Sequence, residues 1–392
     1  MKIVHVITRL ILGGAQQNTI MTCKEQVDSG HQVTLAFGPI YGPEGSLLDD
    51  AQASGAELVE LPMLRREVLP LHDLHGYYAI RKLIRRVKPD VVHTHSSKAG
   101  IIGRAAGWHE HVPAVIHTVH GLPFHGRQPK WVHGCYVAME RWAAGRCHHL
   151  IAITQAMIDA FEAKAICGAD KFTVIPSAVD LSLFDHVDRS VGSVVRRERG
   201  IDEKAFVLGI LARLDRLKGH DDLLDITPQL TARIPNLYLM FIGDGWDRSR
   251  LQQRIIANRL QDKVIMTGLV PHSDLPRLLT AVDVKVLPSY QEGQSRTLIE
   301  ALLCGCGIVA YDVGGIGSIC IDHQTGRLVP LGDHNALAEA IIEMFENPGQ
   351  REQLIRHGRD HVYRYFNAED MVCKIESVYQ RVLHTPGVGS NG

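Results

Sequence analysis

The fold of this chain is decided by the stretch of residues 289–301, which is Ser289-Tyr290-Gln291-Glu292-Gly293-Gln294-Ser295-Arg296-Thr297-Leu298-Ile299-Glu300-Ala301. The apolar, β-branched run 281–287 comes before it, ends at Pro288 and predicts a short buried strand. After a tight loop, apolar residues at helical spacing predict a helix whose N-cap is Ser295. Residues 281–301 are therefore predicted to form a strand, a loop and a helix.

Two carboxylates flank the start of this predicted helix. Glu292 lies in the loop, and Glu300 lies more than one turn into the helix. The backbone amides of residues 295–297 would face the space between them. A helix start of this kind attracts phosphate, and a carboxylate on either side can hold sugar hydroxyls. The residues alone therefore suggest a nucleotide-sugar site.

Length and composition indicate a globular protein of two domains. The chain has 392 residues, 45% hydrophobic and 22% charged, with a net charge of −1. This charge gives no reason to expect a nucleic-acid partner. No apolar run reaches the roughly 18 residues of a transmembrane helix, and residues 1–8 predict a first strand rather than a secretion signal. The eight cysteines form no CxxC pair, which indicates reduced thiols in a cytoplasmic protein.

The first half of the chain alternates apolar strands with helices. A strand at 3–8 leads through Gly13-Gly14 to a helix that ends near residue 28. This pattern predicts a doubly wound parallel sheet, and ligands of such sheets bind at the carboxyl ends of strands. The Gly13-Gly14 loop, His95 and His120 all lie at such ends and are expected to converge. Further strands are predicted at 32–38, 57–61, 89–95, 114–119, 150–154 and 172–175.

A second series of strands and helices follows a stretch rich in charge. Its strands are predicted at 206–211, 238–242, 264–267, 282–287 and 307–311, and the fold class is therefore α/β with two Rossmann-like domains. The predicted division is an N-terminal domain at 1–182, a linker with at most one short helix at 183–203, a C-terminal domain at 204–366, a C-terminal helix at 367–384 and a tail at 385–392.

Two cations follow the first strand of the second domain. Arg213 and Lys218 emerge from the strand end into a loop closed by Gly219. Arginine offers a planar fork and lysine a point charge, so the two together suit a diphosphate. Two cations in a loop are usually surface charge, but the Glu292–Glu300 loop also lies at a strand end, which favours a binding role.

With these motifs in place, the chain resembles the GT4 family of retaining glycosyltransferases over essentially its full length. The resemblance implies the GT-B fold, in which two Rossmann-like domains face a cleft, with the C-terminal helix packing back on the N-terminal domain. The residues that carry it are the E-x7-E motif at Glu292 and Glu300, the R-x4-K pair at Arg213 and Lys218, and the segments 12–16, 90–100, 118–124 and 242–245.

The resemblance also implies a role for each matching residue. Arg213 and Lys218 would bind the donor pyrophosphate, Glu300 the ribose, and Glu292 would face the transferred sugar. His120 would lie by the anomeric region, and Gly14 would present amides to the diphosphate. The catalytic set is thus His120, Glu292, Arg213 and Lys218. The donor-binding set is Gly13, Gly14, Arg213, Lys218, Gly243, Glu292, Gly293, Gln294, Ser295, Arg296, Thr297 and Glu300.

The implied reaction transfers a sugar, with retention, from a nucleotide diphosphate sugar to a glycan or lipid-linked acceptor, as in polysaccharide biosynthesis. A UDP-sugar is favoured and a GDP-sugar remains open. Fixed cations and helix-start amides can stabilise the departing diphosphate, so neither a metal nor a cofactor is expected. Glu292 is expected to position and stabilise the sugar rather than to act as a nucleophile.

The 22 histidines raise the question of zinc. His93 and His95, or His117 and His120 with His125, could suggest a metal site. His93 and His95 are expected on alternate sides of a strand end, and no cysteine or carboxylate completes a set at ligand spacing. No metal site is therefore predicted.

In the basic segment 77–88, the eight positions 81–88 hold five cationic residues. A solvated outer face is the favoured interpretation. The alternative is peripheral contact with an anionic membrane, on the inner face of which an enzyme could reach a lipid-linked acceptor.

Other functions are compatible with the same fold. A sugar-nucleotide epimerase is not expected to carry the full Arg213/Lys218 and Glu292/Glu300 set. A non-catalytic nucleotide-sugar or glycan-binding module would not need that set intact. A dinucleotide dehydrogenase is disfavoured because both β-α openings lack GxGxxG.

Overall fold

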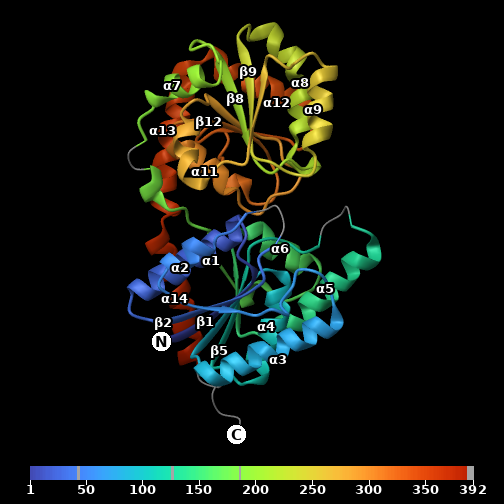
Figure 1. Cartoon of the computed structure of the whole chain (residues 1–392), viewed down its shortest axis with the longest axis vertical. Helices are drawn as coiled ribbons and strands as arrows, with labels where there is room; N and C mark the ends of the chain where they lie inside the picture. The colour runs from blue at the N-terminus through green and yellow to red at the C-terminus, as the bar shows by residue number, and fades with distance from the viewer. Residues whose placement is uncertain (42–44, 125–127, 185–186, 386–392) are drawn as a thin grey trace. The chain divides into compact units, whose positions relative to one another are not determined.

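A computed structural model describes residues 1–41, 45–124, 128–184 and 187–385 (Figure 1). The chain divides into two compact units, which are described separately. Unit 1 comprises Met1–Ala178 and Ala368–Gly392, and unit 2 comprises Val179–Asn367. His125 and residues 386–392 of the predicted tail lie outside the described residues. None of the described helices is both long and apolar enough to cross a membrane.

Unit 1 is built on a parallel sheet of seven strands in the order β3-β2-β1-β4-β5-β6-β7. The strand order reverses beside β1, between β2 on one side and β4 on the other, and such switch points are where ligands of these folds bind. The strands are β1 Lys2–Arg9, β2 Gln32–Gly38, β3 Glu57–Glu60, β4 Val91–His95, β5 Ala114–Val119, β6 His149–Ala152 and β7 Phe172–Val174.

Helices cover the sheet of unit 1, and the C-terminal helix is one of them. The helix α14 lies against the sheet of unit 1 (Figure 1). Its residues Met371, Ile375 and Tyr379 are buried in one cluster with Ile3 and Val91 of the central strands. The predicted return of this helix to the N-terminal domain is therefore confirmed. The helices of unit 1 are α1 Gly14–Asp28, α2 Leu48–Ala53, α3 Pro70–Val87, α4 Ser97–His109, α5 Lys130–Ala144, α6 Gln155–Ala163, η1 Ala169–Lys171 and α14 Ala368–His384.

Unit 2 repeats the architecture with six parallel strands in the order β10-β9-β8-β11-β12-β13. The last strand was not predicted, because its three residues are too few to set up an apolar pattern. The strands are β8 Phe206–Leu211, β9 Leu237–Ile242, β10 Val264–Gly268, β11 Val284–Leu287, β12 Gly307–Tyr311 and β13 Arg327–Val329.

The helices of unit 2 begin inside the segment predicted as a linker. Val195 of α7 and Ile201 are buried in the core of unit 2, so most of residues 183–203 belongs to this unit. The helices are η2 Leu181–Phe184, α7 Val191–Glu198, η3 Arg216–Lys218, α8 His220–Arg233, α9 Arg248–Ala257, η4 His272–Asp274, α10 Leu275–Leu279, α11 Arg296–Leu303, η5 Ile316–Ser318, α12 His334–Glu346 and α13 Pro348–Tyr365.

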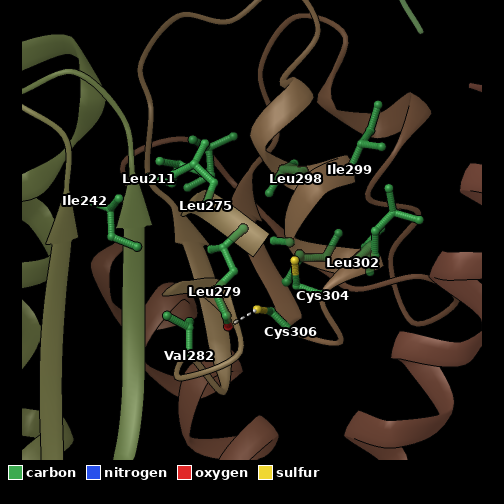
Figure 2. Close-up of a cluster of buried hydrophobic side chains, with 14 of the residues drawn as sticks. Leu211, Ile242, Leu275, Leu279, Val282, Leu298, Ile299, Leu302, Cys304 and Cys306 are labelled. Atoms are coloured by element: carbon green, nitrogen blue, oxygen red, sulfur yellow. Dashed lines mark hydrogen bonds between the residues drawn. The ribbon is translucent and has the colours of Figure 1, made fainter. Parts of the chain in front are cut away.

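Apolar packing fixes the position of α11, the helix that begins inside the stretch 289–301. Figure 2 shows Leu298 and Leu302 turned into a cluster of buried side chains that includes Leu279. Burying a leucine of this kind is worth about 1.5–3 kcal/mol. Cys304 and Cys306 fill the turn after the helix, and the Cys306 thiol donates to the Leu279 carbonyl at 3.3 Å. The start of α11 is therefore held by a rigid core.

Candidate functional site

Two predicted site residues meet in unit 2, although 74 positions separate them. Lys218 Nζ lies 2.7 Å from Glu292 Oε1, with 23% and 12% of the two side chains exposed. The pair joins the loop after β8 to the loop after β11. Because it is partly open to solvent, its ammonium group can reach an incoming anion.

The loop after β8 is shaped so that Lys218 must lie beside the 288–295 loop. The Asp215 carboxylate accepts from the Leu217 amide at 2.9 Å and starts a single 3-10 turn. Gly219 then adopts φ 69, where a Cβ would stand 1.9 Å from the carbonyl oxygen of Pro288. Only glycine fits this approach. The sequence signal for the loop, a glycine one residue after the lysine, thus has a steric cause.

Arg213 and Gly243 occupy the same edge of the sheet. The side chain of Arg213 is 51% exposed, and its nearest carboxylate, on Asp215, is 3.4 Å away. Gly243 follows β9 with φ 131, and a Cβ there would stand 2.3 Å from the carbonyl oxygen of Ala212. The arginine is thus open to solvent, and the glycine allows the loops after β8 and β9 to pack closely.

The start of α11 agrees with the predicted strand, loop and helix. Ser295 is the N-cap residue in extended conformation, and its hydroxyl lies 3.0 Å from that of Thr297. Gly293 accepts from the Gly315 amide through its carbonyl at 2.8 Å, which anchors the loop. Arg296 is predicted as a donor ligand, but its side chain is only 7% exposed. Its backbone amide, rather than its guanidinium, is thus the group that stands at the open helix start.

Glu300 has a partner that the sequence did not reveal. The Glu300 side chain is 4% exposed, and His272 Nε2 lies 3.2 Å from its Oε1. His272 follows β10 directly after Pro271, at the edge of the sheet where ligands bind. That position is the only signal that could have suggested it.

Lys285 is a second residue that sequence reasoning missed. It lies in the middle of β11, is fully buried, and points Nζ at the carbonyl oxygens of Leu211 and Val286, at 3.4 and 3.3 Å. Burial lowers the pKa of Lys285 to about 7, and the negative charge of Glu292 opposes this effect. A strand covered on both faces forces any lysine at its centre into the interior.

Unit 1 brings together two residues predicted to converge. His95 ends β4 and His120 follows β5, and His95 Nδ1 lies 3.0 Å from His120 Nε2. Ser96, next in the chain, has φ 58 and is held by a 2.7 Å contact between its hydroxyl and that of Thr8. A non-glycine residue in this conformation costs on the order of 1–3 kcal/mol, which is typical of functional sites.

The expected placement of His93 and His95 was wrong. Their rings lie on the same side of β4 with centroids 4.3 Å apart, because residues i and i+2 of a strand share a face. His5 of β1 joins them, and among the described residues these three side chains could hold a metal ion, with ligand atoms within 4.8 Å of one another. The sequence reasoning had not considered His5.

Gly13 and Gly14, which follow β1, differ from the expected glycine turn in their backbone conformation and position. Gly13 has φ 177, an extended conformation that any residue can adopt, and its added Cβ would meet only the flexible end of Gln16, at 2.7 Å. Gly14 is exposed and is the first residue of α1. These two residues and His120 belong to unit 1, whereas the other predicted site residues belong to unit 2.

Family models match both halves of the chain. The model for glycosyl transferases group 1 matches residues 193–361, and that for glycosyltransferase family 4 matches residues 12–183. A UDP-Gal:alpha-D-GlcNAc-diphosphoundecaprenol alpha-1,3-galactosyltransferase of Escherichia coli is 27% identical over 96% of both chains. A 2-deoxystreptamine glucosyltransferase of Streptomyces kanamyceticus is 25% identical over 82% of this chain and 87% of its own.

Solved structures share the fold. HepE of Anabaena, crystallised with UDP and glucose, superposes with a TM-score of 0.83 at 21% identity, covering 97% of this chain and 99% of its own. WaaG, a glycosyltransferase involved in lipopolysaccharide biosynthesis, gives 0.73 at 16% identity, covering 98% and 100%. With two Rossmann-like units, each matched by a glycosyltransferase model, the chain belongs to the GT4-type glycosyltransferases of GT-B fold.

Proposed function

We propose that this glycosyltransferase moves a sugar, with retention and without a metal, from a nucleotide diphosphate sugar to a glycan or lipid-linked acceptor. A UDP-sugar is the favoured donor. The observation that carries the proposal is the Lys218–Glu292 pair, 2.7 Å apart at the carboxyl edge of the unit 2 sheet. It combines a cation for a phosphate with a carboxylate for a sugar, beside the open start of α11.

In the proposed reaction, the bond between the anomeric carbon and the phosphate oxygen breaks, and its electron pair leaves with the nucleoside diphosphate. The acceptor hydroxyl oxygen bonds to the same face of the sugar, and its proton passes to the departing phosphate oxygen. Arg213 and Lys218 stabilise the negative charge that develops on the diphosphate. Removing one fixed group that stabilises developing negative charge in an active site typically raises the activation free energy by about 3–4 kcal/mol.

The carboxylates hold the donor rather than exchange protons. Glu292 keeps the Lys218 ammonium in place before the donor arrives and then faces the positive charge on the sugar. Glu300, oriented by His272 at 3.2 Å, is proposed to accept hydrogen bonds from the ribose hydroxyls. His120 of unit 1 is proposed to contact the sugar near its reacting carbon.

The relatives support the choice of donor and acceptor. The E. coli relative is named for UDP-galactose and for an acceptor carried on diphosphoundecaprenol, and HepE was crystallised with UDP-glucose. On this basis we favour UDP as the carrier and a lipid-linked glycan as the acceptor.

The test is a donor panel. Purified protein is incubated with UDP-, GDP- and ADP-sugars, with and without lipid extract and with excess EDTA, and nucleotide release is measured. We expect EDTA-resistant release that depends on the acceptor and is lost in Lys218→Ala, while the exposed control Lys204→Ala keeps it. Analysis of the product anomer tests retention. Donor binding without turnover under every acceptor would favour a non-catalytic binding module instead.

For the surface of α3 we propose peripheral contact with the inner face of an anionic membrane. Leu71, Leu74 and Tyr78 lie at i, i+3 and i+7, hence on one stripe of the helix. They are 72%, 50% and 56% exposed. An exposed apolar stripe next to basic residues is the pattern of interfacial helices.

The ion pairs of α3 oppose this proposal in part. Glu110 engages both Arg81 and Arg85, at 2.5 and 2.8 Å, and Glu57 engages Arg86 at 2.8 Å. Three of the five cations of the segment 77–88 are therefore already paired with two carboxylates, which leaves less positive charge for an anionic surface, and the apolar stripe has to provide most of the attraction.

Vesicle sedimentation separates the two contributions. On vesicles containing anionic phosphatidylglycerol, we expect Leu71→Ser/Leu74→Ser to lose binding, and neutralising the three arginines to weaken it. Ile256→Ser, an exposed apolar position of unit 2, is the matched control. Equal sedimentation of all variants would leave α3 as a solvated face.

A further inference from the structure

A row of buried hydrogen bonds leads from His120 into the interior of unit 1. His120 Nε2 lies 3.0 Å from His95 Nδ1, and His95 Nε2 lies 2.9 Å from His5 Nδ1. His5 Nε2 in turn lies 2.8 Å from Gln26 Oε1. The row therefore runs over three imidazoles and ends on a carboxamide of α1, and His5, His95 and Gln26 are all at most 1% exposed.

The inner imidazoles of this row are neutral. Burial lowers the pKa of His5 to about 4, and burial together with the neighbouring imidazoles holds the pKa of His95 well below its usual range. A neutral imidazole has one N–H donor and one acceptor nitrogen. Each hydrogen bond in the row therefore fixes the direction of the next one.

The direction follows from the carboxamide end. Gln26 Oε1 can only accept, so His5 carries its proton on Nε2 and accepts through Nδ1. His95 must then donate from Nε2 and accept through Nδ1. His120 consequently donates from Nε2, which leaves its Nδ1 as the acceptor nitrogen.

In a second branch the hydrogen bonds are donated away from Gln26. Gln26 donates from Nε2 to the Tyr379 hydroxyl at 3.4 Å, and this hydroxyl is 2.5 Å from His93 Nδ1. His93 Nε2 reaches the Thr118 hydroxyl at 2.7 Å. Gln26 is thus the group that sets both branches. The second branch satisfies both nitrogens of His93 without involving His120.

We propose that Gln26, His5 and His95 are positioning residues that hold His120 as its Nε2–H tautomer, with Nδ1 kept unprotonated. This inference rests on the proposed function for the role of His120 in transfer. Burying so many polar groups costs free energy unless each of them has a hydrogen-bond partner. Because all the hydrogen bonds of this row can form in one donor direction only, His120 is held as a single tautomer.

A metal ion is the competing explanation for the cluster of His5, His93 and His95. Zinc binds imidazole nitrogens at 2.0–2.1 Å, which puts two ligands of a tetrahedral site about 3.3 Å apart. His5 Nδ1 and His95 Nε2 are closer, at 2.9 Å, and each nitrogen of the three rings already has a hydrogen-bond partner in the protein. Hydrogen bonding therefore accounts for the cluster better than ligation does.

The first experiment needs no substrate. Protein labelled with 15N at histidine is examined by long-range 1H–15N NMR correlation, which distinguishes a protonated from an unprotonated ring nitrogen. Signals are assigned by loss in single substitutions at His5, His95 and His120. We expect the Nε2–H tautomer at all three positions, and Gln26→Met should give His120 a mixture of tautomers. An Nδ1–H or doubly protonated His120 in the wild type would overturn the proposal.

The second experiment compares two buried imidazoles. His95→Leu is expected to lower kcat about tenfold or more with a smaller change in KM. His93 is equally buried but does not belong to the row that leads to His120. His93→Leu should therefore destabilise the protein about as much as His95→Leu does, but leave kcat unchanged. His95→Asn, whose amide oxygen can replace Nδ1 as the acceptor for His120, should restore part of kcat. Equal kcat losses in the two leucine variants would reduce the row to a structural feature.

Zinc titration completes the test. Stoichiometric zinc binding by the wild type that is lost in His93→Leu would overturn the relay in favour of a metal site. The tautomer measurement is made on the free protein, so an absence of any transferase activity would refute the proposed function without changing that result.

Discussion

Replacing the buried lysine of β11 tests the electrostatics of unit 2 in a quantitative way. Lys285 titrates at a pKa of about 7 in the fold because burial disfavours its charge, against 10.5 for an ordinary lysine. Between these pH values the unfolded chain binds one more proton than the folded chain. The free energy of unfolding therefore rises with pH in this window, and the penalty from Lys285 is largest below pH 7.

The size of the effect follows from the two pKa values. One proton of difference gives a slope of about 1.4 kcal/mol per pH unit, so the whole penalty is on the order of 5 kcal/mol. From pH 7.5 to pH 9.5 the contribution of Lys285 should change by roughly half of this penalty. Lys285→Met removes the ionisable group, keeps the volume and should stabilise the protein most at the lower pH.

Denaturant unfolding of the wild type and Lys285→Met at several pH values between 7 and 9.5 measures this difference. We expect the two curves of unfolding free energy against pH to converge as the pH rises. Lys204→Met, at an exposed position of the same unit, should stay parallel to the wild type. Parallel curves for the wild type and Lys285→Met would refute the assigned burial penalty.

Three further changes have definite expected outcomes. Arg104 and Glu140 form a 2.7 Å ion pair with 0% and 2% of their side chains exposed, so Arg104→Met should cost about 3–5 kcal/mol in denaturant unfolding, and Arg104→Met/Glu140→Leu should recover most of it. His272→Leu should raise the donor KM about tenfold with little change in kcat, since the hydrogen bond to Glu300 is worth about 1.5–3 kcal/mol; an unchanged KM would separate His272 from donor binding. Gly219→Ala should lower both stability and nucleotide release, because the new Cβ would stand 1.9 Å from a main-chain carbonyl oxygen, and wild-type release would show that the loop gives way easily.

The sequence was sufficient for most of the fold. Apolar strands and helices alternate regularly, so both parallel sheets could be predicted apart from β13, which has three residues. The charged segment 183–203 was harder. Its helix α7 buries only Gly192 and Val195, and a pattern with so few buried apolar residues predicts a linker as readily as a helix.

The candidate site was predictable to the extent that its residues follow strand ends. Lys218 and Glu292 each follow a strand of unit 2, and their contact at 2.7 Å agrees with the expectation that strand-end loops converge. Lys285 and His272 were missed for a different reason. Lys285 is a charged residue inside an apolar strand and His272 lies in a loop, and only the neighbouring strands and loops reveal what each side chain contacts.

The histidine row shows what information, added to the sequence, would have been enough to predict it. His5 and His95 are 90 residues apart in sequence, so no local pattern connects them. Once β1 and β4 are known to be neighbours, however, the parallel register pairs His5 with His93, and the two-residue period of a strand puts His95 on the same face. Strand order and register alone therefore bring the three imidazoles together. A resemblance to a fold of known strand order contains that information, and a polar residue inside an apolar strand is the position at which to apply it.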